Sequence, residues 1–266
     1  MASHTLSNHD ADAIAKPIGL IGGIGLTEVH VYDQRPAPDG KQSGCPHVHA
    51  LTDEAYYVLR GSGKVELHDL KDGYRTLPLK LGDYMHFPPN TMHRLINDGG
   101  LVILGVMGNA GLPEAGDARI YFGPDVDADE AEFKRLLTLP KEKGLEGALD
   151  RRDASVSAYL ELCKLFESDR DAYFAELERY FKKHGDAIGD EADHYEDVIR
   201  RGPVRWGDRV LERLDSLRQG TTRDESSEAG VELNEIGDDE ALGMCGVLRP
   251  MVTLKAVDQL HIKEQT

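Results

Sequence analysis

The chain has 266 residues, with 48 acidic residues against 31 basic ones and a net charge of -17. This balance argues against nucleic acid or an anionic membrane as a main partner, because both bind to basic surfaces. No apolar run approaches the roughly 18 residues of a membrane span, the first residues are too polar for a secretory signal, and three scattered cysteines make no disulfide framework, so we expect a cytoplasmic protein.

A polar segment, residues 1–13, precedes a region of short β-type segments over residues 14–123. Most of these segments are rich in β-branched or aromatic residues, and turns of glycine, proline, asparagine and aspartate separate them. Many short strands without intervening helices predict an antiparallel sandwich or barrel. We expect strands near 17–21, 26–32, 46–50, 54–59, 64–69, 74–80, 84–87, 92–97 and 101–107. The glycine-rich run 19–25 precedes a strand and not a helix, so it predicts a turn and no organic cofactor site.

The region from residue 124 to residue 220 is helical in character. Apolar residues at helical spacing predict helices near 127–139, 155–184, 191–200 and 204–217. We interpret this region as a lid over the β domain or a dimerisation element, and we expect a homodimer. Residues 221–266 are predicted as a loop with two candidate strands, near 231–236 and 246–257, that could add to the β domain. Six aromatic residues at helical spacing are predicted to pack against the β domain or another subunit: Tyr159, Phe166, Tyr173, Phe174, Tyr180 and Phe181.

Three histidines and one glutamate in the β domain have the spacing of a metal site. His47 and His49 are two residues apart, so on a strand both side chains point to the same face. Glu54 has the opposite parity, which requires a turn between residues 50 and 53 and brings its carboxylate in from the next strand. His93 follows a proline turn at 88–90. Three imidazoles and a carboxylate suit a first-row divalent metal, and the lack of a thiolate argues against a cysteine-rich structural zinc site.

These residues closely resemble the two-part signature of the cupin superfamily. The first part, G-x5-H-x-H-x4-E-x6-G, has Lys41 in place of its opening glycine and is otherwise matched by His47, His49, Glu54 and Gly61. The second part, G-x5-P-x-G-x2-H-x3-N, has Asn90 in place of its middle glycine and is otherwise matched by Gly82, Pro88, His93 and Asn97. Asparagine tolerates positive φ better than most residues, so we expect the turn at Asn90 to form.

The resemblance implies a mainly β protein with added α structure. Its core would be a small, jelly-roll-like antiparallel barrel, followed by a mainly helical C-terminal region that the resemblance does not cover. One divalent transition metal would be held by His47, His49, Glu54 and His93. Iron(II) is favoured, and Mn, Ni, Zn or Co also suit such a donor set. Four protein ligands leave positions at which a substrate oxygen and either dioxygen or water meet.

The leading hypothesis is an iron(II) dioxygenase that oxidises a small polar organic substrate chelated to the metal. The first alternative is a non-redox isomerase, epimerase or lyase that uses Mn, Zn, Ni or Co. The second is a non-catalytic module that binds a sugar or another metabolite. Oxygen consumption during turnover separates the first two, because only the dioxygenase requires it.

Glu54, Tyr56 and His86 are the candidate catalytic residues. Glu54, when it loosens from the metal, is expected to act as a general base. Tyr56 shares the face of Glu54, so its phenol is expected to orient the substrate or donate a proton; the alternative is an aromatic that fills the barrel. His86 is expected to face the substrate, or otherwise to be structural. Cys45 is expected to be a small buried or rim residue.

Overall fold

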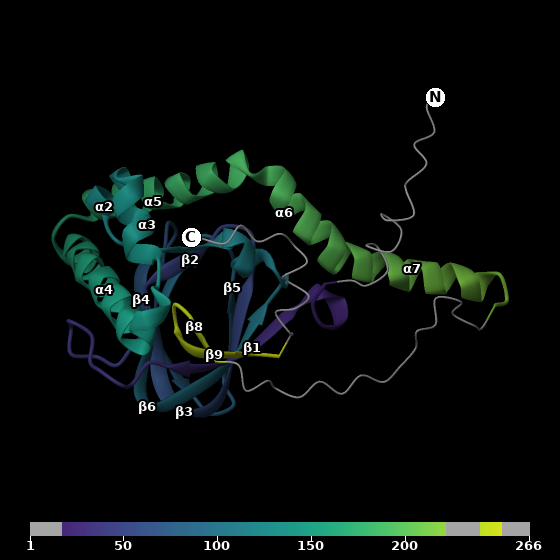
Figure 1. Ribbon diagram of the computed structural model, residues 1–266, viewed down its shortest axis with the longest axis horizontal. Helices are drawn as coiled ribbons and strands as arrows, with labels where there is room; N and C mark the ends of the chain where they lie inside the picture. The colour runs from purple at the N-terminus through teal and green to yellow at the C-terminus, as the bar shows by residue number, and fades with distance from the viewer. Residues whose placement is uncertain (1–17, 222–239, 252–266) are drawn as a thin grey trace.

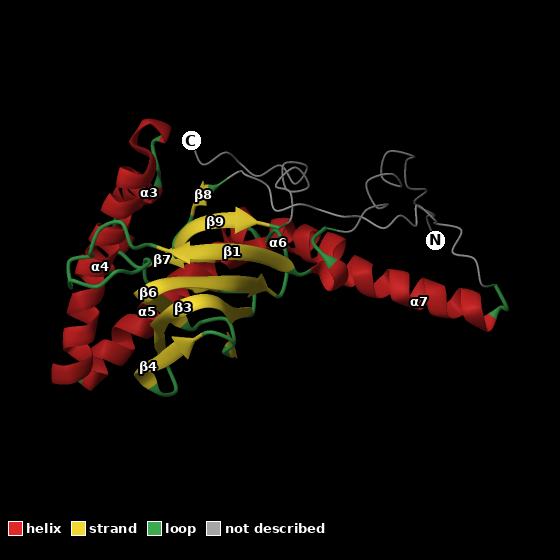
Figure 2. Cartoon of the chain, turned by 90° about the horizontal axis from the view of Figure 1, so that it is seen from below, coloured by secondary structure: helices red, strands yellow, loops and turns green. Residues whose placement is uncertain are grey.

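A computed structural model of the protein describes residues 18–221 and 240–251. In this part of the chain, nine antiparallel strands form one sheet that curls into a barrel, as the resemblance implies (Figures 1 and 2). The main path of the sheet is β4-β3-β6-β1-β9-β8, while β2 pairs with β6 and β7, and β5 pairs with β3. The strands are β1 (Gly25–Val31), β2 (His47–His49), β3 (Glu54–Asp69), β4 (Gly73–Lys80), β5 (Tyr84–Phe87), β6 (Met92–Met107), β7 (Ala118–Ile120), β8 (Ala241–Leu242) and β9 (Gly246–Pro250).

The paired strands β3 and β6 are each longer than predicted. The glycine-rich segments at 61–63 and 98–100, which predict turns, instead lie opposite each other within the pairing, where the register shifts. Gly61 has a φ of 72°, and a Cβ there would lie 2.3 Å from the carbonyl oxygen of Gly100. Asn97 completes this irregularity, because its Oδ1 accepts hydrogen bonds from the N–H groups of Gly99 and Leu101. These segments therefore form a bulge through which both strands continue.

Two other expectations about turns have opposite outcomes. The predicted strand at 17–21 is wrong for its described residues, because Gly19, Gly22 and Gly23 have positive φ and Ile21–Gly23 forms a 3-10 turn, η1. Asn90 has a φ of 58° and is the only non-glycine residue with positive φ among those described. The turn before His93 therefore forms with asparagine in place of glycine, as expected.

The helical region covers one side of the barrel and extends beyond it (Figures 1 and 2). Two predicted helices are each divided in two by an aspartate, Asp129 or Asp169, whose side chain accepts a hydrogen bond from the N–H groups of the following helix and so starts it. The helices are α2 (Pro124–Ala128), α3 (Glu130–Leu137), α4 (Gly144–Ser168), α5 (Arg170–Asp190), α6 (Ala192–Ile199) and α7 (Arg205–Arg218), with short turns η2 (Pro113–Asp117), η3 (Lys141–Lys143) and η4 (Arg200–Val204).

The aromatic residues of α4 and α5 pack against the barrel. Tyr159, Tyr173 and Tyr180 are fully buried and share a cluster with Val48 and Met92 of the barrel wall. A separate apolar core fills the barrel interior from strands β1, β3, β4, β5 and β6. The layer of helices is thus fixed to the outer face of the barrel by aromatic side chains. None of the described helices is long and apolar enough to cross a membrane.

The end of the chain returns to the barrel. Strand β9 pairs antiparallel with β1, so the predicted strand near 246–257 is formed over residues 246–250. The remainder of that prediction, and the candidate strand near 231–236, lie outside the described residues. Strand β8 forms a short hairpin with β9.

Candidate metal centre

Three short elements bring the four predicted metal ligands together inside the barrel. Strand β2 carries His47 and His49, and the β2–β6 pairing sets His47 directly opposite His93. Glu54 is the first residue of β3, after the turn at 50–53. All four side chains are buried, and one donor atom from each lies within 4.8 Å of the others. The spacing of the sequence is thus converted into a compact set of three imidazoles and one carboxylate.

The donor atoms approach one another closely. The Nε2 atoms of His47 and His93 are 3.0 Å apart. The Oε2 atom of Glu54 lies 3.1 Å from Nε2 of His93 and 3.3 Å from Nε2 of His49. The same Oε2 atom has no hydrogen-bond partner in the described part of the chain, although it is buried. Four polar atoms therefore converge on one small volume.

The outer ring nitrogens determine which way each imidazole presents its lone pair. Nδ1 of His47 donates to the carbonyl oxygen of Cys45 at 2.9 Å, and Nδ1 of His93 donates to that of Thr91 at 3.0 Å. Because a carbonyl only accepts, both Nδ1 atoms carry the proton and both Nε2 atoms direct lone pairs inward. Nδ1 of His49 faces Oδ2 of Asp117 at 3.5 Å. Anchoring of the outer nitrogen by a carbonyl or carboxylate is the usual support for a metal-binding histidine.

The electrostatics of the site favour a cation. Burial, followed by the nearby His93 and His49 rings, holds the pKa of His47 well below its usual value. Burial alone would raise the pKa of Glu54, but His93 and His49 outweigh it and the pKa lies well below its ordinary value. For His49, Asp117 and Glu54 outweigh burial and raise the pKa to about 9. Facing lone pairs and a buried carboxylate are unfavourable unless positive charge lies between them, so these residues fit a divalent metal.

The fold of this region is also recognisable by comparison with known proteins. Residues 34–107 match the family model of the cupin domain. This segment is a cupin domain. The match includes all four candidate metal ligands and ends where β6 ends, and it leaves the helical region without a family. No curated protein matches the chain significantly.

Solved structures similar to the chain also align over a limited part of it. A protein named as a candidate sugar phosphate isomerase from Acidithiobacillus ferrooxidans is 27% identical over 32% of this chain and 49% of its own, with a TM-score of 0.25. A cupin protein from Bacteroides fragilis is 19% identical over 41% of this chain and 85% of its own, with a TM-score of 0.27. A DMSP lyase from Ruegeria pomeroyi is 20% identical over 32% and 38%, with a TM-score of 0.25. At these TM-scores, the similarities assign no activity to this chain.

Tyr56 lies inside the cupin barrel next to the candidate metal ligands. Its side chain is 1% exposed, its ring lies 6.2 Å from the ring of His93, and its hydroxyl has no hydrogen-bond partner among the described residues. Burial, the Glu54 carboxylate and the Cys245 thiol raise the pKa of Tyr56 well above its usual value. The hydroxyl therefore keeps its proton and has a hydrogen bond to offer.

His86 and Cys45 are separated from the centre of the cupin domain. His86 pairs with Ala55 in the β3–β5 ladder and is exposed on the outer face, beside Tyr84, while its neighbour Phe87 points inward. The structure thus places the third predicted catalytic residue on the side of the sheet opposite to the metal ligands. Cys45 is buried, as expected; its side chain packs with Ile120 and α3, and only its carbonyl serves the metal centre.

Asp117 and Cys245 lie at the centre but were not singled out from the sequence. Asp117 is fully buried, and its carboxylate accepts hydrogen bonds from the N–H groups of residues 50, 51 and 52 while it faces His49. It thereby fixes the turn that separates His49 from Glu54. Sγ of Cys245 lies 3.6 Å from Nε2 of His47. Both contacts join segments far apart in the chain, so no local feature of the sequence signals either of them.

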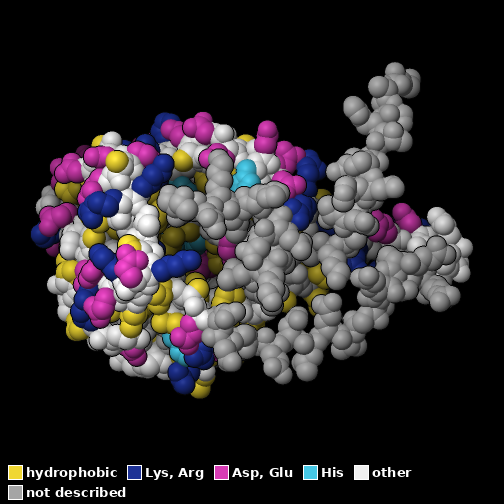
Figure 3. Space-filling model, viewed as in Figure 1, with side chains coloured by type: hydrophobic (Ala, Val, Ile, Leu, Met, Phe, Trp, Pro, Cys, Tyr) yellow, Lys and Arg dark blue, Asp and Glu magenta, His cyan; other side chains and the backbone are white. Residues whose placement is uncertain are grey.

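Two hollows lie outside the ligand set. A cavity of about 910 Å³ between β7, α3 and the α5–α6 turn has walls that include Glu114, Arg119, Phe133 and His184. It borders the metal centre through His184, whose Nε2 donates to the carbonyl oxygen of Asp117 at 2.8 Å. Figure 3 shows the face viewed in Figure 1, with a hollow lined by apolar, acidic and histidine side chains.

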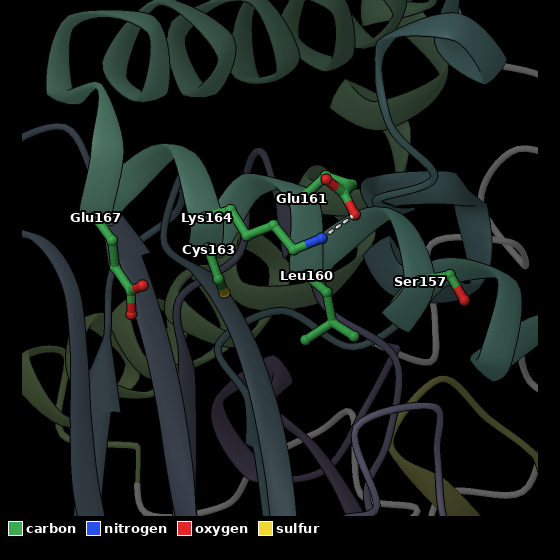
Figure 4. A pocket seen from close by; sticks show the side chains of 6 residues that line it. All are labelled: Ser157, Leu160, Glu161, Cys163, Lys164 and Glu167. Atoms are coloured by element: carbon green, nitrogen blue, oxygen red, sulfur yellow. Dashed lines mark hydrogen bonds and ion pairs between the residues drawn. The ribbon is translucent and has the colours of Figure 1, made fainter.

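The second hollow is a groove along α4 alone, where Lys164 pairs with Glu161 (Figure 4). A groove formed by one helix does not enclose a ligand.

Proposed function

We propose that this protein is a metal-dependent enzyme of the cupin superfamily, and that it is an iron(II) dioxygenase acting on a small polar organic substrate. One observation carries the proposal: three imidazole rings and a carboxylate oxygen without a hydrogen-bond partner among the described residues converge in a buried site. The outer nitrogens of His47 and His93 are anchored by carbonyl oxygens, and that of His49 faces the carboxylate of Asp117. When bound, the ion would supply Lewis acidity and, as iron, electron transfer. His47, His49, Glu54 and His93 would hold it.

The residues around the ligands support chemistry more than storage of a metal. Tyr56 offers an unpaired hydroxyl inside the barrel, where it would donate a hydrogen bond or a proton to a substrate oxygen. Glu54 is ionised, so it would be the proton acceptor nearest the ion when it loosens from it. The apolar interior, with Phe87 in ring contact with both Tyr56 and His93, would exclude water from the reacting atoms.

A non-redox isomerase, epimerase or lyase is the second candidate, and the free hydroxyl of Tyr56 favours it. Such reactions move a proton on a substrate whose carbonyl the metal polarises, and they require an acid and a base near the ion. Tyr56 and Glu54 would fill these two roles. A non-catalytic binding module would use the same site without either proton transfer.

Elemental analysis of the purified chain tests the metal. We expect about one divalent transition metal per chain after metal-replete expression, and loss of it in His47→Ala. A content below about 0.2 per chain in the unmodified protein would contradict the proposal. His86→Ala is the matched control, because it removes an exposed histidine of the same sheet.

Oxygen uptake then separates the two enzyme classes. The iron-loaded protein is mixed with a panel of small hydroxy acids, keto acids and diols in an oxygen electrode, and product formation is followed in parallel. Uptake that accompanies product supports the dioxygenase. Product without uptake supports the isomerase or lyase, and binding without product on any compound supports the binding module.

A further inference from the structure

The C-terminal hairpin brings a thiol to the edge of the metal centre. Cys245 lies in the turn between β8 and β9, and its side chain packs against the apolar core of the barrel. Its Sγ atom is 3.6 Å from Nε2 of His47, a residue 198 positions earlier in the chain. No local feature of the sequence predicts this contact, since it arises from the return of the chain to β1.

The turn that carries this thiol is held firmly from several sides. The N–H of Cys45 donates to the carbonyl oxygen of Met244 at 2.8 Å, and the hydroxyl of Tyr32 donates to that of Gly243 at 2.9 Å. The guanidinium of Arg151 donates to the same Gly243 oxygen at 3.0 Å. The barrel and helix α4 therefore position the turn through three separate donors.

Glycines give this turn its close approach. A Cβ at Gly44 would lie 2.7 Å from the Cα of Cys245, and a Cβ at Gly246 would lie 2.0 Å from the carbonyl oxygen of His30. Neither position has room for a side chain. Gly44 lets the turn approach the segment before β2, and Gly246 lets β9 approach His30 of β1. The placement of the thiol is therefore specified by the sequence on both sides of the contact.

Unpartnered polar atoms surround the thiol. Tyr56 is 1% exposed, and its hydroxyl has no hydrogen-bond partner in the described part of the chain; the same is true of Oε2 of Glu54. The atoms around the thiol therefore have coordination capacity that the described residues do not use.

We propose that Cys245 supplies a thiolate ligand to the metal ion held by His47, His49, Glu54 and His93. Donor atoms bonded to one zinc ion at about 2.1 Å for nitrogen and 2.3 Å for sulfur lie at most about 4.4 Å apart, and the observed 3.6 Å is within this limit. Sγ is not among the four atoms that lie within 4.8 Å of one another, so coordination requires the thiol and the other donors to move closer together when the ion binds. The thiol proton is released to solvent when the sulfur binds.

A thiolate ligand reduces the number of metal ions that suit the site. Thiolates favour iron, cobalt and zinc over manganese and magnesium, which prefer oxygen donors. The inference rests on the proposed metal site, and it adds a donor that the resemblance to the cupin superfamily does not imply. It also predicts that the C-terminal hairpin contributes directly to metal affinity, although it lies outside the matched residues 34–107.

Cobalt(II) loading of the full chain tests the thiolate and the metal site separately. Visible ligand-field bands report that cobalt is bound, and a near-ultraviolet thiolate-to-cobalt charge-transfer band reports a sulfur ligand. We expect both in the unmodified protein. Cys245→Ser should keep the ligand-field bands, lose the charge-transfer band and bind cobalt at least about tenfold more weakly, by analogy with the loss of supporting residues at metal sites. Cys163→Ser is the matched control and should keep both bands.

The outcomes are distinct. Ligand-field bands without a charge-transfer band in the unmodified protein, or a charge-transfer band that survives in Cys245→Ser, would overturn the thiolate and leave the proposed function intact. A chain that binds no cobalt and no other divalent metal would overturn both. X-ray absorption of the zinc-loaded unmodified protein decides the question without any variant, because a sulfur shell at about 2.3 Å is expected and its absence contradicts the proposal.

Discussion

The barrel has a buried histidine on its outer face and three buried histidines at the candidate metal centre, and the two environments differ in whether the protein satisfies every ring nitrogen. On the outer face, His68 is fully buried under α4 and α5, with Nε2 at 2.7 Å from the hydroxyl of Tyr159 and Nδ1 at 2.9 Å from that of Tyr173. Tyr159 in turn donates to Glu66 at 3.1 Å. Because the Tyr159 proton goes to Glu66, Nε2 of His68 must donate to Tyr159, and Nδ1 accepts from Tyr173.

Every donor and acceptor of His68 is therefore satisfied by the protein. At the metal centre, by contrast, the inward Nε2 atoms of His47 and His93 face each other at 3.0 Å, and Oε2 of Glu54 has no partner among the described residues. Burial alone does not distinguish a structural histidine from a metal ligand; the closure of the hydrogen-bond network does. The comparison predicts that a substitution at the metal centre lowers metal affinity, whereas a substitution at His68 lowers the free energy of unfolding.

The largest difference is expected between a substitution at the metal centre, His93→Ala, and one at the structural histidine, His68→Gln. His93→Ala should weaken zinc affinity by at least about 100-fold, since loss of a direct ligand exceeds the loss of a supporting residue. His68→Gln should leave zinc affinity unchanged and lower the free energy of unfolding by about 1–3 kcal/mol, because Tyr159 and Tyr173 lose a partner. Chelator competition and urea unfolding measure the two quantities. Equal losses of zinc affinity in both variants would remove the distinction.

Asp117→Asn tests the anchoring of His49. The variant loses the carboxylate that faces Nδ1 of His49 and accepts three backbone hydrogen bonds, so zinc affinity should fall about 10–100-fold. Asp127→Asn is the matched control, because Asp127 is equally buried but pairs with Arg119 and Arg179. Competition with a chromophoric chelator measures both variants. Unchanged affinity in Asp117→Asn would show that His49 needs no carboxylate.

The pH dependence of stability tests the structural role of His68. Burial lowers the pKa of His68 to about 3, below its unfolded value of about 6.5, so the unfolded state binds the proton more readily. This contribution to stability is complete above about pH 6.5 and is lost as the pH falls, by about 1.4 kcal/mol per unit, or about 2 kcal/mol at pH 5. Urea unfolding of chelator-treated protein at pH 7 and pH 5 measures it. His68→Gln should lose about 2 kcal/mol less over this interval than the unmodified chain, and equal losses would contradict the assignment.

The smallest effect is expected at His86. This histidine is exposed on the outer face of the sheet and lies in neither environment, so His86→Ala should change the free energy of unfolding by no more than about 0.5 kcal/mol. Zinc affinity should also stay unchanged. A loss of turnover in this variant, measured once a substrate is found, would restore the catalytic role predicted from the sequence.

The convergence of the four candidate metal ligands could be predicted from the sequence because their placement depends on short-range rules. His47 and His49 share a face through strand parity, and the Asn90 turn has the expected positive φ. Prediction was less successful where glycines serve pairing as well as turning. The segments around Gly61 and Gly100 pair as a bulge, so four predicted strands merge into β3 and β6.

Long-range contacts account for what could not be predicted. Asp117 meets residues 50–52, and Cys245 meets His47, through packing of segments far apart in the chain. His86 illustrates the converse, since its residue type suits a catalytic role but the inward position of Phe87 turns it outward. A period of two identifies which residues share a face, but it does not identify which face is the interior.

The pairing of β9 with β1 also has a consequence for synthesis of the protein on the ribosome. Strand β1 is complete after residue 31, but its partner β9 begins only at residue 246. Until then one side of β1 is an open edge with unpaired backbone groups, which is a site for aggregation or wrong pairing. The nascent barrel must therefore wait for nearly the whole chain before that edge closes, and we expect chains halted before residue 246 to depend on chaperones for their solubility.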